Sequence, residues 1–280
     1  MSSVILGRFR GMPAQDGAGV KLTRIINQPG LKHQDPFLML DEFRSDNPDD
    51  YIAGFPPHPH RGFCTLTYML AGQMEHKDSV GNTGVVEAGG VQWMKAARGI
   101  IHAEMPKQEA GLMWGFQLWV NLPAAEKMSE PAWYDYPADV IPEIDRGNAV
   151  IRVVAGEHGG KTGPVDAPGR DFLMLDLVFN AAETLTVAAQ GQRQRLGYVY
   201  KGNVSVNGEA VARGELVRLD TDAELIIEGS ADSGLLLLAA QPINEPIAQY
   251  GPFVMNNSVE IEQAIRDYQN GTLAANQKLT

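Results

Sequence analysis

The sequence predicts an all-β protein that contains two copies of one β-sandwich or barrel domain and ends in a single helix. Three observations support this fold class. The 280-residue chain breaks into short β-type runs separated by 30 Gly and 17 Pro residues, which is typical of sandwiches and barrels. Helical periodicity is almost confined to the C-terminus, and a short pattern occurs twice along the chain.

The predicted strands are runs of β-branched, aromatic and aliphatic residues between turn signals. They cover residues 65–70, 85–88, 116–121, 151–154, 172–178, 197–201, 216–219 and 235–240. One helix is predicted from Ser258 to about Gln269, because the apolar residues of this stretch fit one helical face. Gly271 follows at the position of a C-terminal cap.

The repeated pattern has the form LxYxxxG. It occurs at residues 66–72 and again at 196–202, and Ala88-Gly89-Gly90 is echoed by Ala212-Arg213-Gly214. Between the two copies, residues 124–148 are rich in proline and acidic residues, which indicates an inter-domain connection. We therefore expect an N-terminal domain of residues 1–135 and a C-terminal domain of residues 136–280 that includes the helix.

Composition argues against several classes of protein. The formal net charge is −11, whereas direct binding of nucleic acid needs clustered Lys and Arg. The single cysteine, Cys64, permits no intramolecular disulfide and indicates a reducing compartment. Residues 1–11 lack the apolar core of a signal peptide, and no stretch approaches the length of a membrane span. We expect a cytoplasmic protein that does not enter a membrane.

Two pairs of polar residues predict a metal site. His58 and His60 are two residues apart, with Pro59 between them, and His102 and Glu104 repeat this spacing about forty residues later. Residues i and i+2 of a strand project from the same face, and proline within a strand indicates an edge. An HxH motif alone often lies in a solvated loop, so the prediction depends on the second pair and on the Gly-rich, short-strand context.

Three imidazoles and one carboxylate suit Fe(II), Mn, Ni, Cu, Zn or Co, and are too rich in nitrogen for Mg or Ca. Four protein ligands on a five- or six-coordinate ion leave one or two positions open for water, substrate or dioxygen. This arrangement is typical of a catalytic site rather than a closed structural one.

Seven segments resemble the pirin family, and the resemblance spans nearly the whole chain. They are GFPPHPHRGF at 54–63, TYML at 67–70 followed by Gly72, HKDSVGN at 76–82, QWM at 92–94, ARGIIHAEMP at 97–106, QLWVNLP at 117–123 and GPFVMN at 251–256. The resemblance implies a bicupin, two cupin β-sandwich barrels in tandem, with one metal ion in the N-terminal barrel. Pirins carry iron on the residues that match His58, His60, His102 and Glu104 here. Some members cleave the flavonol quercetin with dioxygen, and others are described as regulators that act through protein partners.

The second barrel is expected to hold no metal. Counting without gaps from the repeated glycines places Ala188 and Gln190 opposite the first histidine pair. The same count places Ile226 and Glu228 opposite His102 and Glu104. No imidazole remains at these positions.

Three details of the site stay open. Cys64 stands where many pirins have Glu, and it is either a small buried hydrophobe or, by alternation from His58, a thiol close to the metal. His76 and Asp78 follow a turn and fit a solvated loop or a hydrogen-bonding role better than a ligand role. Phe55, Phe63 and Met105 lie near the ligands in sequence and are candidates to line a pocket for a flat aromatic substrate.

Two functions are compatible with these residues. The first is an iron dioxygenase in which Glu104 accepts the proton of a flavonol-like hydroxyl, with a small aromatic molecule and O2 as substrates. The alternative is a non-catalytic iron protein that regulates a protein partner through its oxidation state. We expect a monomer in either case.

Overall fold

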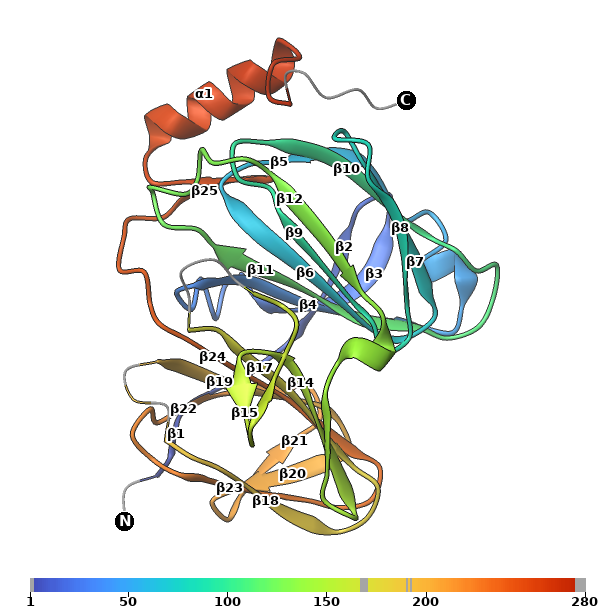
Figure 1. Cartoon of the computed structure of the whole chain (residues 1–280), viewed down its shortest axis with the longest axis vertical. Helices are drawn as coiled ribbons and strands as arrows, with labels where there is room; N and C mark the ends of the chain where they lie inside the picture. The colour runs from blue at the N-terminus through green and yellow to red at the C-terminus, as the bar shows by residue number, and fades with distance from the viewer. Residues whose placement is uncertain (1–2, 167–170, 190, 192, 275–280) are drawn as a thin grey trace. The chain divides into compact units, whose positions relative to one another are not determined.

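The computed structural model describes residues 3–166, 171–189, 191 and 193–274, and it divides the chain into two compact units (Figure 1). The first unit comprises Pro13–Gln28, Asp35–Ala138 and Ile243–Thr280. The second unit comprises Met1–Met12, Pro29–Gln34 and Asp139–Pro242. Each unit contains one seven-stranded and one four-stranded antiparallel sheet, so the all-β tandem sandwich predicted from the sequence is confirmed.

In the first unit, the large sheet has the order β12-β9-β6-β11-β4-β3-β2 and the small sheet the order β5-β10-β7-β8. The large sheet is built from β2 (Met12–Asp16), β3 (Val20–Ile26), β4 (Phe37–Ser45), β6 (Phe63–Ala71), β9 (Val91–Lys95), β11 (Met113–Asn121) and β12 (Ala132–Tyr136). The small sheet is built from β5 (Phe55–His60), β7 (Gln73–Asp78), β8 (Thr83–Glu87) and β10 (Ile100–Pro106).

The second unit repeats this plan, with the orders β1-β22-β19-β24-β17-β14-β13 and β18-β23-β20-β21. Its large sheet is built from β1 (Ile5–Arg10), β13 (Glu143–Asp145), β14 (Ala149–Ala155), β17 (Leu173–Phe179), β19 (Gln194–Lys201), β22 (Glu215–Leu219) and β24 (Ser233–Ala240). Its small sheet is built from β18 (Glu183–Val187), β20 (Asn203–Val206), β21 (Glu209–Ala212) and β23 (Leu225–Gly229).

Few elements lie outside these sheets in the described part of the chain. They are the hairpins β15 (Glu157–His158) with β16 (Lys161–Thr162) and β25 (Ala248–Tyr250) with β26 (Phe253–Met255), the 3-10 turns at Pro48–Asp50 and Ala138–Val140, and the helix α1 (Ser258–Gln269). No described helix has the length and apolar character needed to cross a bilayer.

The helix α1 begins and ends where the sequence predicted. The Asn257 side chain accepts a hydrogen bond from the Glu260 backbone N–H at 3.0 Å, which caps the first turn. Gly271 follows the last turn with a φ of +69°, a conformation that favours glycine. The buried face of the helix packs on Phe253 and Met255 of β26, and Ile101 of β10 joins the same cluster.

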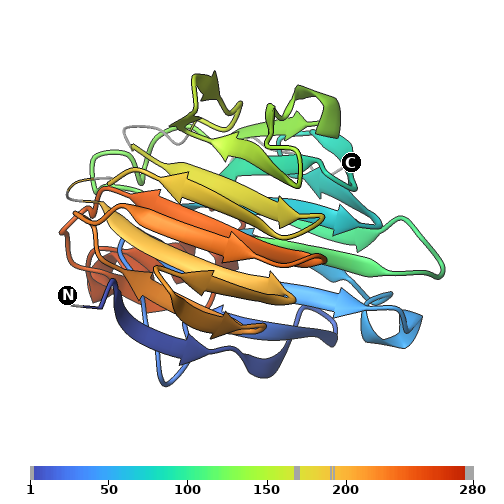
Figure 2. The same cartoon turned by 90° about the horizontal axis from the view of Figure 1, so that it is seen from below.

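The two units are not the contiguous halves, 1–135 and 136–280, that we expected. The strand β1 pairs with β22 and forms the edge of the second unit's large sheet, as the blue strand beside its orange neighbour in Figure 2 shows. The segment from Ile243 onward, with α1, belongs instead to the first unit. Each end of the chain thus packs on the other half, an exchange that strand patterns cannot reveal because pairing partners far apart in sequence leave no local signal.

The proline- and acid-rich stretch 124–148 is also more structured than a linker. It contains β12, which pairs with β9, and β13, which pairs with β14. The division between the units falls at Ala138 and Asp139, so the connection itself is only the short turn at Ala138–Val140.

The internal repeat corresponds to a real structural repeat, with a shift of one residue. Gly72 and Gly202 both have positive φ, at +84° and +60°, and each leads into the third strand of its small sheet. The Gly89 N–H donates to Met69 O at 2.8 Å, and the Gly214 N–H donates to Val199 O at 2.7 Å. Gly89 is therefore the counterpart of Gly214, and the gap-free match with Gly90 was wrong by one position.

Candidate metal centre

The two predicted ligand pairs lie on neighbouring strands. In the small sheet of the first unit β10 pairs with β5, His102 lies opposite His58, and Ile100 lies opposite His60. The strand β5 is at the edge of this sheet, where Pro59 can be accommodated because no further strand needs its missing N–H. The antiparallel register therefore places the HxH and HxE motifs side by side.

Three imidazoles form one cluster. One ring nitrogen of each of His58, His60 and His102 lies within 4.8 Å of the others, and this is the group of metal-ligating side chains found among the described residues. Their ring centroids are 4.4 to 4.9 Å apart. His60 and His102 are buried, whereas His58 is only half-buried, so the cluster is accessible from the side of His58.

The hydrogen bonds of each ring leave one nitrogen facing the cluster. His58 Nδ1 lies 2.8 Å from Pro56 O, a ring nitrogen of His60 donates to the Pro252 carbonyl, and His102 Nδ1 lies 3.3 Å from His76 Nδ1. The opposite nitrogens of the two buried rings, His60 Nδ1 and His102 Nε2, have no hydrogen-bond partner. Buried polar atoms are rarely left unpaired, and a divalent cation would satisfy both, so the residues fit a metal ion.

Electrostatics keep these rings in the form that binds metal. Burial lowers the pKa of His60 and His102 well below the ordinary value for histidine, and the neighbouring imidazoles lower it further. Both side chains are therefore neutral near pH 7, with a lone pair available on the nitrogen that faces the cluster.

Glu104 is buried on the same strand as His102, but its carboxylate is not part of the three-histidine group. Its Oε1 accepts a hydrogen bond from the Thr67 hydroxyl at 2.9 Å, and this hydroxyl also lies 2.6 Å from the Gln117 side chain. The register of β10 with β5 shifts between His102 and Glu104. His102 therefore lies opposite His58, whereas Glu104 lies opposite Phe55. The structure therefore brings together three of the four predicted ligands and holds the fourth on Thr67.

The sequence favoured a solvated loop or a hydrogen-bonding role for His76 over a ligand role, and the structure shows the hydrogen-bonding role. This residue is fully buried on β7 rather than placed in a solvated loop, and it contacts His102 on one side and Asp78 on the other. Its ring also stacks on Trp133, with centroids 5.4 Å apart. The signal was present, because His76 and Asp78 have the same i, i+2 spacing as the other two pairs.

Aromatic side chains flank the cluster on the side of His60. The Phe63 and Trp119 rings lie 5.0 and 5.2 Å from the His60 ring, centroid to centroid. Phe55 packs further along, against the apolar core of this unit. Met105 follows Glu104 on β10 and therefore projects from the opposite face. Of the predicted lining set, Phe63 contacts the His60 ring and Phe55 lies opposite Glu104 in the strand register.

The C-terminal segment supports the cluster from outside. Besides the Pro252 contact with His60, Val254 N–H donates to Arg61 O at 3.0 Å. Gly62 has a φ of +91°, and a side chain there would collide with Val254 O. The buried Lys127 ammonium lies 2.7 Å from Gly62 O and 3.0 Å from Val254 O, and so joins the two segments.

Cys64 does not lie beside the cluster. Thr67 on β6 projects toward Glu104, so Cys64, three residues earlier, projects from the opposite face of the strand. The alternation from His58 fails because β5 ends at His60 and Gly62 turns the chain before β6 begins. Burial raises the pKa of the Cys64 thiol, so this residue is the small buried hydrophobe and not a reactive thiol near a metal.

The second unit has aliphatic side chains at the matching positions. His76 and Val206 both lie four residues after the repeated glycine, and their cross-strand partners are Glu104 and Ile227. Two residues earlier, His102 corresponds to Leu225, whose partner Val187 corresponds to His58. These four aliphatic residues belong to one buried core cluster.

The gap-free count for the second barrel was therefore wrong in position. It landed on Ala188, Ile226 and Glu228, which face solvent, while Gln190 lies outside the described residues. The expected loss of imidazoles holds at the true counterparts that the strand register identifies.

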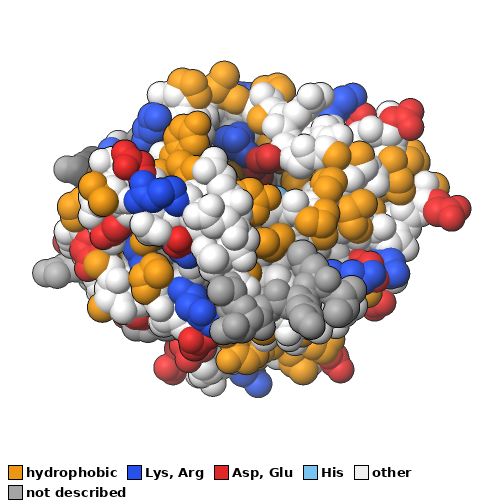
Figure 3. All heavy atoms as spheres, turned by 90° about the horizontal axis from the view of Figure 1, so that it is seen from above, with side chains coloured by type: hydrophobic (Ala, Val, Ile, Leu, Met, Phe, Trp, Pro, Cys, Tyr) orange, Lys and Arg blue, Asp and Glu red, His pale blue; other side chains and the backbone are white. Residues whose placement is uncertain are grey.

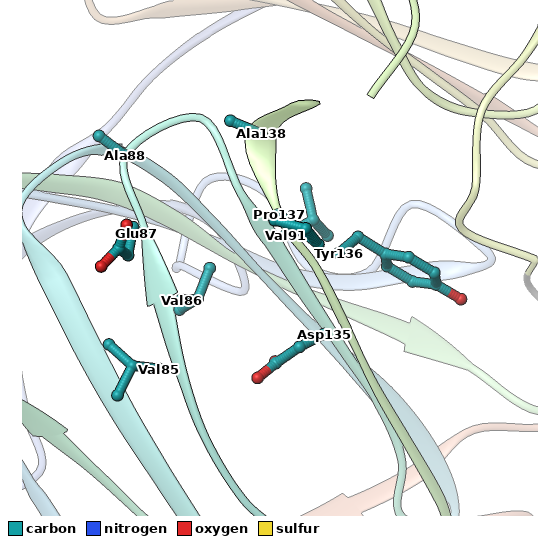
Figure 4. A pocket seen from close by; sticks show the side chains of 9 residues that line it. All are labelled: Val85, Val86, Glu87, Ala88, Val91, Asp135, Tyr136, Pro137 and Ala138. Carbon is teal, nitrogen blue, oxygen red and sulfur yellow. The ribbon is translucent and has the colours of Figure 1, made fainter. Parts of the chain in front are cut away.

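A separate small cavity of about 160 Å³ lies between β8 and β12 (Figure 4). It is lined mainly by apolar side chains, and the Asp135 carboxylate points toward the strand that carries Val85 and Val86. None of the three clustered histidines lines it. On the face shown in Figure 3, Lys and Arg are interspersed with Asp and Glu rather than joined into a basic surface.

The chain matches two family models. Residues 19–120 match the model described as Pirin, and residues 174–274 match the Pirin C-terminal cupin domain. Among relatives, a Pseudomonas aeruginosa protein named "Putative quercetin 2,3-dioxygenase" is 47% identical over 96% of this chain and 98% of its own. A pirin-like protein of Caulobacter vibrioides is 44% identical over 95% and 98% of the two chains. The crystal structure of quercetin 2,3-dioxygenase from Acinetobacter baumannii superposes with a TM-score of 0.86 at 32% identity, over 96% of this chain and 97% of that one.

Two antiparallel sandwiches of one plan, with a three-imidazole cluster in one of them, define a bicupin with one candidate metal centre among the residues that the structure describes. The matches to both domain models extend this class to a family. The chain belongs to the pirin family.

Proposed function

We propose that this protein is a metal-dependent dioxygenase that cleaves quercetin or a related flavonol with O2, using one Fe(II) ion. The observation that carries the proposal is the cluster of three imidazoles in which two buried nitrogens, His60 Nδ1 and His102 Nε2, have no hydrogen-bond partner. The names of the Pseudomonas relative and of the Acinetobacter structure support the reaction class.

His58, His60 and His102 would hold the ion, with Glu104 as a fourth ligand from the same strand as His102. Nitrogen donors exclude Mg and Ca as natural occupants, and Fe(II) is the member of the remaining set that the pirin resemblance favours. When bound, the ion supplies a Lewis acid that favours the anionic form of a hydroxyl group, together with one-electron chemistry toward O2.

The chain's own residues contribute proton transfer and exclusion of water. Glu104 lies two residues after His102 on β10, and it would accept the proton of the substrate hydroxyl. Thr67 donates to Oε1 of Glu104 and so orients the carboxylate. Phe63 and Trp119 form an apolar wall beside His60, which suits the flat face of an aromatic substrate and displaces water from it.

The test is metal analysis of protein expressed with iron available, followed by quercetin turnover in air on the same sample. We expect near-stoichiometric iron and ring cleavage that stops without O2. His60→Ala should lose both metal and turnover, whereas Glu104→Gln should lose more turnover than metal. Stoichiometric iron with no oxygen-dependent cleavage of any flavonol would contradict the dioxygenase assignment while leaving the metal site in place.

The regulatory alternative is not favoured. The Pseudomonas aeruginosa and Vibrio cholerae relatives are both named as putative quercetin 2,3-dioxygenases, and no specific observation on the described residues points to a protein partner.

A further inference from the structure

Two further side chains, His76 and Asp78, extend from the ligand candidate His102 in a series of hydrogen bonds that ends at a turn of the small sheet. His102 Nδ1 is 3.3 Å from His76 Nδ1, and His76 Nε2 is 3.3 Å from Asp78 Oδ2. All three side chains are buried. The register of β10 with β7 sets this arrangement, because His102 lies directly opposite Asp78 and His76 lies opposite Glu104.

The direction of these hydrogen bonds follows from the last member of the chain. A carboxylate only accepts, so His76 must donate from Nε2 to Asp78. The Nδ1 of a neutral His76 then carries the lone pair and accepts from His102, which must hold its proton on Nδ1. The proton is thereby kept off His102 Nε2, the unpaired nitrogen that faces the cluster.

Asp78 is itself fixed by the turn that follows β7. Its Oδ1 accepts from the backbone N–H groups of Val80 and Asn82, both at 2.9 Å, and its Oδ2 accepts from Asn82 Nδ2 at 2.8 Å. The carboxylate cannot rotate without losing these bonds, so the acceptor that His76 meets is preorganised.

The His76 ring is held from its faces as well. Trp133 stacks on it, and Gly84, the residue paired with His76 on β8, leaves the space that Trp133 and Asp135 occupy. A side chain at Gly84 would collide with both. The packing therefore fixes the plane of the ring while Asp78 fixes its tautomer.

We propose that Asp78 and His76 are positioning residues that lock His102 in the Nδ1–H tautomer and so keep its Nε2 free for a metal ion. The inference rests on the proposed ligand role of His102. Residues that orient metal-binding histidines typically contribute about 10–100-fold to metal affinity, and an effect of this size is expected here.

The Asp78→Asn substitution makes a sharp test because the turn dictates how the new amide is oriented. The two backbone N–H groups require an oxygen at the Oδ1 position, so the amide NH2 must face His76. The Asn82 amide, which donates to Oδ2 in the wild type, must then turn its oxygen toward the new NH2. A donor at that place forces the lone pair of His76 onto Nε2 and its proton onto Nδ1. His102 must then accept at Nδ1 and carry its proton on Nε2, where the metal would bind.

The tautomers can be measured directly in metal-free, ¹⁵N-labelled protein at pH 8 by long-range ¹H–¹⁵N correlation of the imidazole rings. In the wild type we expect His102 as the Nδ1–H tautomer and His76 as the Nε2–H tautomer, and in Asp78→Asn the reverse for both. A wild-type His102 that carries its proton on Nε2 would overturn the proposal without any variant, so failure of Asp78→Asn to fold leaves the test intact.

Metal affinity, measured by competition with a chelator for Zn(II), supplies the second readout. Asp78→Asn should bind about 10–100-fold more weakly than the wild type. The matched control is Asp135→Asn, which removes a nearby negative charge that interacts with His76 through space and leaves the hydrogen bonds of His76 unchanged. Equal losses in the two variants would show that charge, not hydrogen-bond direction, matters, and would overturn the proposal.

These outcomes are distinguishable from failure of the proposed function. The tautomer measurement needs neither metal nor substrate, and a protein that binds Zn(II) with the expected tautomers but cleaves no flavonol would contradict only the dioxygenase assignment. Absence of Zn(II) binding by the wild type would contradict the metal site itself.

Discussion

The two units share one plan of strands and differ in what fills the small-sheet side of the sandwich. In the first unit the positions of His58, His102, Glu104 and His76 carry groups that bind, donate or accept. In the second unit the counterparts Val187, Leu225, Ile227 and Val206 pack into a continuous aliphatic core. The comparison shows that this plan of strands can be formed with either interior, so the candidate metal centre is a matter of side chains and not of the strand plan.

The polar interior also needs support that the aliphatic interior does not. The first unit has a chain of hydrogen bonds behind His102, a hydroxyl behind Glu104, and a C-terminal segment behind His60. Each unpaired buried polar group costs free energy. The titratable groups can therefore be buried only because these hydrogen-bond partners are present. No such chain is needed where leucine and valine fill the same positions.

The largest effects are expected from truncating the matched residues His102 and Leu225. His102→Ala should weaken metal binding by more than about 100-fold, since residues behind the ligands already contribute about 10–100-fold. Leu225→Ala should leave metal affinity unchanged and lower the free energy of unfolding by about 2–5 kcal/mol, because it creates a cavity in a packed core. Chelator competition and urea unfolding of the metal-free proteins measure the two effects.

This pair of variants also tests the comparison itself. In metal-free protein, His102→Ala should lower the free energy of unfolding by less than Leu225→Ala does. If both variants destabilise equally, the histidine cluster is part of the structural core of its unit, and the division between a binding interior and a packing interior is wrong.

A smaller effect is expected at Lys127, the buried cation that joins the C-terminal segment to the metal unit. Its ammonium lies 2.6 Å from Asn121 Oδ1 in addition to the two backbone carbonyls of Gly62 and Val254. Lys127→Met leaves these buried acceptors without a donor, and should lower the free energy of unfolding by about 1–3 kcal/mol near pH 7. Urea unfolding measures the difference from wild type.

The pH dependence gives this prediction a sign. Burial lowers the pKa of Lys127 from 10.5 to about 8, so between these values the unfolded chain binds the proton that the folded chain has released. Wild-type stability should therefore rise with pH across that window relative to Lys127→Met. A difference between the two proteins that stays constant from pH 7.5 to 10 would show that the ammonium is not perturbed.

Much of this arrangement follows from the sequence, and the remainder has identifiable physical causes. The i, i+2 spacing of His58 with His60 is enough to place two imidazoles on one strand face, because strand periodicity is local. The pairing of β10 with β5 then brings His102 beside them. The gap-free count matched Gly90 instead of Gly89 to Gly214 because counting ignores the length of a turn. The sequence left two readings of Cys64 open because the turn at Gly62 resets which side chains face inward. The exchange of chain ends and the Pro252 contact depend on pairing across about two hundred residues, which no local pattern records.

The smallest effect is expected at Thr67, whose counterpart in the second unit is Gly197, one residue after the repeated leucine in each copy. The aliphatic interior of the second unit needs no hydroxyl at this position. In the first unit the Thr67 hydroxyl donates to Oε1 of Glu104. Thr67→Val keeps the shape of the side chain and removes this bond, so the carboxylate should lose its fixed orientation. We expect quercetin turnover to fall about 10-fold, or about 1.4 kcal/mol in the barrier, while bound iron stays near one per chain.

Thr65→Val makes the same chemical change two residues away on the same face of β6 and serves as the matched control. Turnover by Thr67→Val that equals that of Thr65→Val would mean that Glu104 is held by its strand alone. A tenfold loss confined to Thr67→Val would instead show that a binding interior differs from a packing interior in the partners behind its functional groups as well as in the groups themselves. That result would extend the contrast between the two units from the ligand candidates to the residues that orient them.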